Sequence, residues 1–159
     1  MTNTERMRCE NGREPAPHEA EVNMPKILIV EDDQLVANIY GNRLSRAGCE
    51  VKIGPDVQAG LDLVRRFCPD VVILDLLLPK VTGVELIKTI RAEPTLAHLP
   101  VIVLSNAYLT SVMVQARKAG ATICISKDHT NPGQVVEAVR QVLALKQAPA
   151  SAPTPSVPA

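Results

Sequence analysis

Hydrophobic residues in this chain form short continuous runs that are separated by longer stretches of mixed polarity. Three of the runs, Ile27–Val30, Val71–Leu74 and Val101–Leu104, are apolar at every position. Runs of this length are typical of parallel strands that helices cover on both faces. Two further segments, Glu50–Ile53 and Thr122–Ser126, alternate in polarity and suit the edges of the same sheet. The pattern therefore predicts five strands, with the fully apolar ones in the centre.

A stretch in which apolar residues recur at helical spacing follows each strand. The first expected helix has apolar positions from Leu35 to Leu44 and ends at Gly48. The next three run from about Pro55 to Phe67, from Gly83 to just before Pro94, and from about Leu109 to Ala119. The fifth has apolar positions from Val135 to Leu143. Strands that alternate with helices through right-handed crossovers form a parallel sheet. We therefore expect the fold class to be α/β, a doubly wound five-stranded parallel sheet in the order 2-1-3-4-5 with five helices, flavodoxin-like.

The two ends of the chain lack hydrophobic periodicity. Residues 1–25 mix charges with prolines, and residues 147–159 are rich in proline and alanine. We expect a flexible leader, one ordered domain over residues 26–146, and a disordered tail whose alternative role is that of a docking peptide. No second globular domain is expected after Lys146, so no module for DNA binding is expected either.

Charge and cysteine content narrow the function classes. The 17 basic and 17 acidic residues cancel, so no overall field favours nucleic acid or an anionic membrane. The leader has no apolar stretch of the kind found in signal peptides, and no apolar run is long enough to span a bilayer. Cys49 and Cys124 lie in strand-like segments, which favours buried free thiols. These features predict a cytoplasmic protein.

Polar residues stand where the predicted strands end. Glu31 and Asp32 follow the first strand, Asp75 follows the third, and Lys127 follows the fifth. In the order 2-1-3-4-5 the topological switch point lies between strands one and three, and ligands bind at the carboxyl ends of strands there. The three carboxylates are therefore expected to meet in one crevice.

This set of residues suits phosphoryl chemistry. Three carboxylates raise one another's pKa unless a cation intervenes, and oxygen ligands of this kind suit Mg²⁺. Lys127 is either a surface lysine or a partner for Asp75 or for a phosphate placed on it. Ser105, at the end of the fourth strand, is either a satisfied hydroxyl or a donor to a phosphoryl oxygen. A carboxylate nucleophile beside Mg²⁺ and a lysine suits an in-line phosphoryl transfer.

Four segments in this order resemble the receiver domain of bacterial two-component response regulators, in its single-domain form. They are Ile27–Asp33, Asp75–Gly83, Pro100–Ser105, and Ala119–Ala121 followed by Lys127 and Asp128. The resemblance covers about residues 25–146. Each motif is weak by itself, and their order and spacing together are specific.

The resemblance implies a role for each matching position. Asp75 corresponds to the aspartate that accepts a phosphoryl group from a histidine kinase or a histidine phosphotransfer protein. The implied Mg²⁺ ligands are Glu31, Asp32, Asp75 and the backbone carbonyl of Leu77. The remaining matches are the switch hydroxyl Ser105 with its neighbour Asn106, the phosphate-contacting Lys127, and the loop-shaping Pro79 and Gly83.

Departures from the family pattern affect the switch. Cys124 stands where the family usually has an aromatic residue. In the family, the ring of that residue turns inward on phosphorylation, and this change cannot occur in the same form here. Asn106 occupies a position where a small residue is usual, where it either hinders access or bonds the phosphate. Leu77 and Ala107 cannot position a water through their side chains, which predicts slow dephosphorylation.

Two other functions stay open at this point. One is a protein-interaction domain that keeps the fold without using phosphate. The other is an aspartyl phosphohydrolase, which is disfavoured because Leu77 occupies the position of its second acid. We thus expect no enzyme beyond catalysis of its own phosphorylation and slow dephosphorylation. The expected partners are the phosphodonor and an unknown downstream protein, without DNA or membrane, and a transient dimer stays open.

Overall fold

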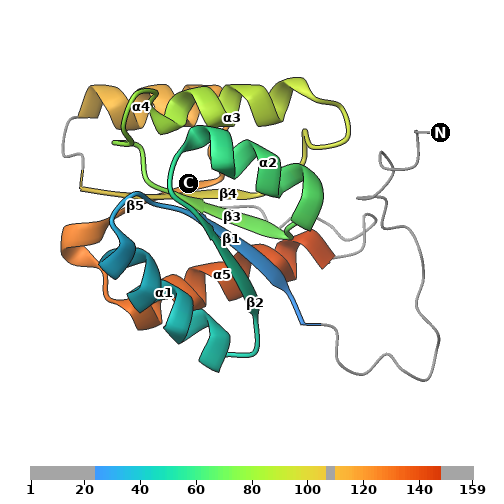
Figure 1. The fold of residues 1–159 in the computed structure, drawn as a ribbon, viewed down its shortest axis with the longest axis vertical. Helices are drawn as coiled ribbons and strands as arrows, with labels where there is room; N and C mark the ends of the chain where they lie inside the picture. Colours follow the sequence, from blue (N-terminus) through green and yellow to red (C-terminus); the bar gives the residue numbers. More distant parts are fainter. Residues whose placement is uncertain (1–23, 107–109, 148–159) are drawn as a thin grey trace, which may run out of the picture.

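Five parallel strands and five α-helices alternate along the chain (Figure 1), and the computed structural model describes residues 24–106 and 110–147. The strands are β1 (Lys26–Val30), β2 (Glu50–Gly54), β3 (Val71–Leu74), β4 (Val101–Ser105) and β5 (Ile123–Ser126). The helices are α1 (Gln34–Arg46), α2 (Val57–Phe67), α3 (Gly83–Ala92), α4 (Thr110–Ala119) and α5 (Pro132–Gln147), with a short 3₁₀ turn, η3 (Lys127–His129), after β5. Of the predicted leader (residues 1–25) and tail (residues 147–159), residues 1–23 and 148–159 lie outside the described residues.

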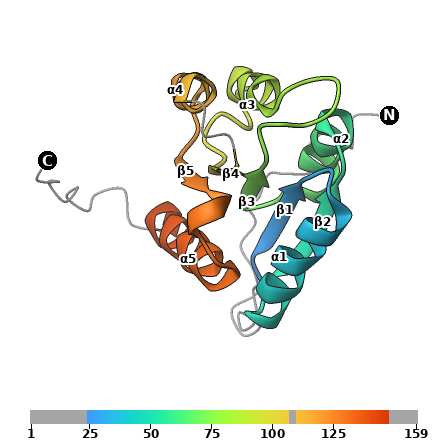
Figure 2. The same ribbon diagram turned by 90° about the vertical axis from the view of Figure 1, so that its left-hand side faces the viewer.

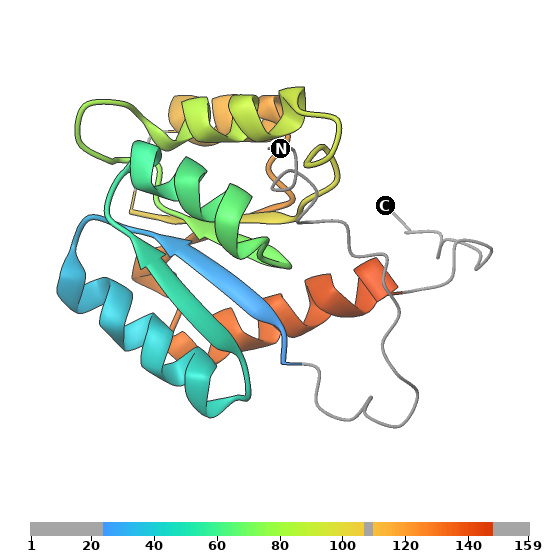
Figure 3. The same ribbon diagram turned by 45° about the vertical axis from the view of Figure 1, so that its right-hand side comes forward.

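The strand order is β2-β1-β3-β4-β5, and every pair is parallel. The predicted fold class and order are therefore confirmed. Helices α2, α3 and α4 cover one face of the sheet, while α1 and α5 lie side by side on the other (Figures 2 and 3).

Each face of the sheet has its own aliphatic core. On β1, Leu28 and Val30 pack toward α2, α3 and α4, whereas Ile27 and Ile29 pack toward α1 and α5. All four side chains are almost completely buried. Burial on both faces explains why the runs Ile27–Val30, Val71–Leu74 and Val101–Leu104 of the central strands carry no polar residue.

Local signals set the helix ends much as predicted. Asp33 caps α1, because its side chain accepts hydrogen bonds from the backbone N–H groups of Leu35 and Val36. Gly48 follows α1 with a φ of +96°, a left-handed conformation that suits glycine. The second helix begins at Val57, two residues after the expected Pro55, since Asp56 serves as its cap.

The edge strands differ from each other in burial. β2 alternates between exposed and half-buried residues up to its end, as its sequence predicts. β5 does not alternate, because all four of its residues are half-buried. Ile123 and Ile125 pack on the α1–α5 side and Cys124 packs on the opposite side, so both faces of this edge are partly covered.

The sequence predicts two buried free thiols, Cys49 and Cys124, and no membrane-spanning segment. Cys49 and Cys124 are free, with Cys49 buried and Cys124 half-buried. Burial raises the pKa of the Cys49 thiol. Over residues 24–106 and 110–147, none of the helices has the length and apolar character needed to cross a membrane.

Candidate functional site

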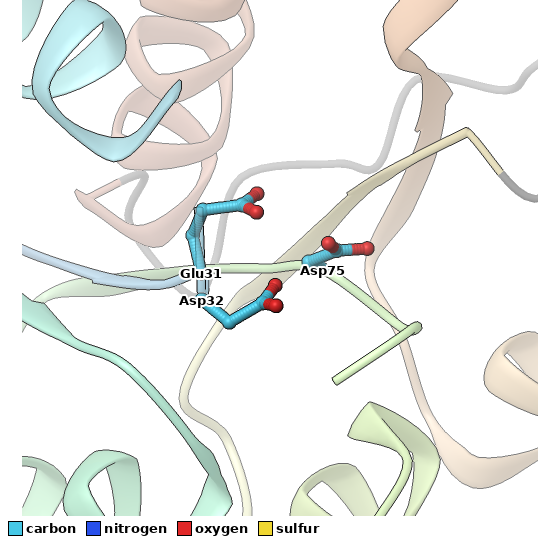
Figure 4. Close-up of side chains that lie close together, drawn as sticks. All are labelled: Glu31, Asp32 and Asp75. Atoms are coloured by element: carbon cyan, nitrogen blue, oxygen red, sulfur yellow. The ribbon is translucent and has the colours of Figure 1, made fainter. Parts of the chain in front are cut away.

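Three carboxylates meet at the carboxyl ends of β1 and β3. The register pairs Val30 with Leu74, so the residues that follow each strand become neighbours. Glu31, Asp32 and Asp75 each offer an oxygen, and these oxygens lie within 4.8 Å of one another. Figure 4 shows the three side chains beside one another at these strand ends. The three carboxylates therefore meet at the switch point, as expected.

Burial differs among the three acids. Glu31 and Asp75 are buried, with relative exposures of 6% and 7%, whereas Asp32 is exposed. Burial raises the pKa of Glu31 above its usual value of 4.5, and the charge of Asp75 adds to this effect. A hydrogen bond from Lys127 opposes it. The site thus holds negative charge that costs free energy unless a cation balances it.

Lys127 provides such a cation from the carboxyl end of the edge strand β5. It begins η3 directly after β5, and its side chain is only 13% exposed. Its Nζ lies 2.6 Å from Oε1 of Glu31 and 3.3 Å from Oδ2 of Asp75. Burial lowers the pKa of Lys127, but the hydrogen bond to Glu31 and the charge of Asp75 outweigh burial and raise it overall. The contact with Asp75 was one of the alternatives that the sequence left open, and the shorter contact with Glu31 was missed.

Backbone N–H groups orient the two buried carboxylates. Oε2 of Glu31 accepts a hydrogen bond from the N–H of Asp33 at 3.2 Å. Oδ1 of Asp75 accepts one from the N–H of Leu77 at 3.1 Å. Each carboxylate therefore has one oxygen on the backbone and one toward Lys127, which fixes its orientation.

The end of β4 brings a hydroxyl to the same edge of the sheet. Ser105 is fully buried, and Asn106, the residue after it, is exposed. The register places Ser105 beside Ser126, the last residue of β5. The Oγ of Ser126 is buried and has no hydrogen-bond partner among the described residues. Sequence reasoning did not single out Ser126, since serine at a strand end carries no distinct signal.

A tight turn follows Asp75. The N–H of Val81 donates to the carbonyl of Pro79 at 2.6 Å, and Lys80 between them has a φ of +67°. This three-residue turn reverses the chain between β3 and α3. Leu77, which lies between Asp75 and this turn, is exposed.

Gly83 closes this loop against the site. Its N–H donates to the carbonyl of Leu76 at 2.9 Å. A Cβ at this position would lie 2.6 Å from the carbonyl oxygen of Asp75, closer than real contacts allow. Only glycine lets the start of α3 approach the backbone of Asp75 this closely.

The donor set fits a hard divalent cation. Carboxylate oxygens are the ligands that Mg²⁺ and Ca²⁺ prefer, and two of the three here are already oriented by the backbone. The exposed Asp32 leaves one side of the cluster open to solvent. The cluster of Glu31, Asp32 and Asp75 could therefore hold a metal ion.

Comparison with known proteins assigns the family. The model of the response regulator receiver domain matches residues 27–140. The polar-differentiation response regulator DivK of Brucella anthropi is 30% identical over 121 residues, which cover 76% of this chain and 98% of DivK. The DNA-binding dual master transcriptional regulator RpaA of Synechocystis is 32% identical over 122 residues, 77% of this chain. The matched part spans about half of RpaA (49%).

Solved structures show the same fold. The chemotaxis response regulator CheY4 of Vibrio cholerae aligns with a TM-score of 0.70 and 26% identity, over 76% of this chain and 99% of that one. A CheY-like receiver domain protein from Methanospirillum hungatei aligns with a TM-score of 0.74 and 24% identity, over 79% and 98% of the two chains. The chain therefore belongs to the response regulator receiver domain family.

Proposed function

We propose that this receiver domain accepts a phosphoryl group on Asp75 from a histidine kinase or a histidine phosphotransfer protein. A carboxylate oxygen of Asp75 attacks the phosphorus of the phosphohistidine, the P–N bond breaks, and the imidazole leaves. The observation that supports this most directly is that Asp75 lies among two further carboxylates and a lysine at the ends of β1, β3 and β5. Such a site can balance the charge of a transferring phosphoryl group.

Mg²⁺ is the cation that we propose for the acidic cluster. Its protein ligands are Glu31, Asp32 and Asp75, together with the backbone carbonyl of Leu77. When bound, it neutralises charge on the phosphoryl oxygens. The chain itself keeps Glu31 and Asp75 oriented through the N–H groups of Asp33 and Leu77.

The other polar residues bind the phosphoryl group in this proposal. Lys127 is already held at Asp75 and contacts a phosphate oxygen once the transfer is complete. Ser105 and Asn106 approach the phosphate from the end of β4, and their movement changes the surface at α4. Pro79 and Gly83 shape the loop that carries Leu77, so they keep its backbone near the site.

The protein signals in this proposal through a partner or by relaying the phosphoryl group. It catalyses only its own phosphorylation and slow dephosphorylation, and it acts in the cytoplasm, where its phosphodonors are found. DNA binding, which the name of RpaA records, is not part of the proposal, because the match spans only 49% of that protein.

The nucleophile can be tested with a small phosphodonor. The protein is incubated with acetyl phosphate and Mg²⁺, and its intact mass is measured. We expect one phosphoryl adduct on the native protein and none on Asp75→Asn. Asp62→Asn, which changes an exposed aspartate on α2, is the matched control and should be labelled like the native protein. An undiminished adduct on Asp75→Asn would contradict the assignment.

The metal role needs a separate measurement. In the double variant Glu31→Gln with Asp32→Asn, Mg²⁺ binding by calorimetric titration and labelling by acetyl phosphate should be lost together. Unchanged Mg²⁺ affinity would show that these acids are not ligands. A chain that binds its partners equally well with and without labelling would favour the alternative, an interaction domain that does not use phosphate.

A further inference from the structure

A polar concavity lies between α1 and α5, away from the acidic cluster. It has a volume of about 380 Å³, and its charged lining consists of Arg43, Arg46, Glu137 and Arg140. We call it the arginine cavity. Arg43 stands nine residues after the start of α1, which is roughly 14 Å along the helix axis from the end nearest the acidic cluster. The cavity is therefore a separate site.

The arginine cavity carries positive charge that the described residues do not balance. Three guanidinium groups face it, against the single carboxylate of Glu137. Within residues 24–106 and 110–147, no ion pair links any of these four side chains to another residue. Arginine keeps its charge at every physiological pH, so the group cannot relieve its repulsion by losing a proton. An anion in the cavity would relieve it.

Helix-end effects explain only part of this cluster. Arg43 and Arg46 lie near the carboxyl end of α1, where basic residues favourably meet the helix dipole. Arg140 lies in the interior of α5, where that effect is absent. The first turn of α5 is already capped, since Asn131 and Gln134 exchange side-chain-to-backbone hydrogen bonds of 2.9 Å. Helix-end effects therefore do not explain why Arg140 lies beside Arg43 and Arg46.

Gly133 leaves room for the side chain of Arg43. A Cβ on Gly133 would lie 3.0 Å from Nη2 of Arg43, which is tighter than ordinary contact. The missing side chain thus lets the Arg43 guanidinium rest against the first turn of α5. Arg43 is exposed, so its guanidinium is accessible to a ligand, and its planar fork matches two oxygens of a phosphate.

We propose that the arginine cavity binds a small phosphate ester of mononucleotide size. The phosphate lies on the guanidinium groups of Arg43, Arg46 and Arg140, and Glu137 accepts a hydrogen bond from a hydroxyl or amino group of the same ligand. The cavity volume falls within the range of roughly 300–1,000 Å³ found for small-molecule sites. Glu137 repels a bare polyanion and favours a ligand that also carries a donor.

The test is a titration of the isotope-labelled protein followed by amide chemical shifts. Adenosine and guanosine monophosphate are the probes, with pyrophosphate and citrate as simple anions. A mononucleotide should shift amides of residues 43–47 and 133–140 in a saturable way. Arg43→Gln and Arg140→Gln should each weaken its affinity about tenfold, as expected for loss of a charge-assisted pair. Arg117→Gln, an exposed arginine in the last turn of α4, should leave it unchanged.

Glu137→Gln separates a phosphate ester from a simple anion. It should weaken the mononucleotide and strengthen pyrophosphate, because the carboxylate accepts from the first and repels the second. Tighter binding of citrate, or of a peptide rich in glutamate, would overturn the proposal and favour an acidic protein segment as the occupant. The absence of saturable shifts at about 10 mM mononucleotide would overturn it as well.

Two controls keep this site distinct from the phosphorylation site. Asp75→Asn should bind the mononucleotide like the native protein. Arg140→Gln should be labelled by acetyl phosphate like the native protein, so either proposal can fail while the other holds. Shifts confined to the surroundings of Glu31 and Lys127 would place the ligand at the acidic cluster and overturn the arginine cavity as its site.

Discussion

Nζ of Lys127 lies 2.6 Å from Oε1 of Glu31, a shorter contact than the 3.3 Å to Oδ2 of Asp75. The lysine therefore joins the end of β5 to the ends of both β1 and β3. Without a metal ion, this ammonium is the cation that balances two buried carboxylates. Lys127 therefore balances charge in the metal-free protein, in addition to making the phosphate contact that we propose.

Lys127→Met should destabilise the metal-free protein by about 3 kcal/mol, because removal of one partner leaves buried carboxylates unpaired. Saturating Mg²⁺ should restore part of this loss, since the ion replaces the missing charge. The measurement is urea unfolding with and without Mg²⁺. Lys88→Met is the control, as Lys88 forms an exposed pair with Glu85 at 3.6 Å that contributes less than about 1 kcal/mol. Equal effects of the two substitutions would show that Lys127 does not balance the site.

Glu31 should make the stability of the metal-free protein depend on pH. Burial raises its pKa in the folded state above 4.5, so the folded protein binds the proton more tightly than the unfolded chain. Stability from this group is complete below about 4.5 and is lost as the pH rises through the folded pKa. Glu31→Gln should therefore gain stability over the native protein as the pH is raised from 4.5 toward neutrality.

Urea unfolding at a series of pH values checks this dependence. Glu50→Gln, at an exposed position of β2, is the control and should follow the native curve. A native protein that becomes more stable than Glu31→Gln on raising the pH would reverse the sign and contradict the burial effect. Added Mg²⁺ should reverse the order of the two proteins if Glu31 is a ligand.

The conformation of the loop after Asp75 requires glycine at position 83. Gly83→Ala should cost about 2 kcal/mol, because its Cβ would meet the carbonyl oxygen of Asp75 at 2.6 Å and the backbone must shift. The same shift should slow labelling by acetyl phosphate. Gly41→Ala, in α1, is the control, since its Cβ would make only ordinary contacts of 3.6 Å or more with side chains of β1 and β2.

Gly41→Ala should stabilise the protein by up to about 1 kcal/mol, because alanine favours helix over glycine. Urea unfolding of both variants gives the comparison. A harmless Gly83→Ala substitution would show that the loop relaxes freely and that close approach is not required.

The surface change on phosphorylation should be centred on β4 and α4. Cys124 cannot act as an aromatic switch, and Ser105 lies buried at the end of β4 directly before this region. Hydrogen exchange with a phosphoryl mimic should change over residues 105–119. Changes limited to β2 and α2 would contradict this picture.

The sequence predicts the sheet and the acidic cluster because both depend on short-range patterns. Apolar runs fix which segments are central strands, and the strand order then brings Glu31 beside Asp75. The contact between Lys127 and Glu31 could not be predicted. It depends on the conformation of a flexible lysine side chain that can reach both Asp75, 52 residues away, and Glu31, 96 residues away. Side-chain geometry across elements carries no local signal.

The same limit applies to other features of the structure. The approach of Gly83 to Asp75 and the arginine cavity both arise where two elements pack against each other. Arg43 and Arg140 read as ordinary surface residues of separate helices, and only the pairing of α1 with α5 brings them together. The alternation expected for β5 fails for a related reason, because partial cover on both faces hides it.

The lifetime of the phosphorylated state should be limited by the residue at position 77. Hydrolysis of an aspartyl phosphate requires a water molecule held in line with the P–O bond, usually by a polar side chain. Leu77 follows Asp75 by two residues and is 53% exposed, and its side chain has no polar atom that could hold such a water. Ala107, the other position expected to matter, lies outside the described residues. We therefore expect slow decay in the native protein.

Leu77→Asn should shorten this lifetime several-fold, because the amide can hold the water while the N–H of residue 77 still donates to Asp75. Leu77→Ala is the matched control, since it opens the same space without supplying a hydrogen bond. Decay is followed by intact mass after removal of acetyl phosphate. Acceleration by alanine equal to that by asparagine would mean that Leu77 slows hydrolysis by excluding water. Fast decay in the native protein that neither substitution alters would show that another group positions the water.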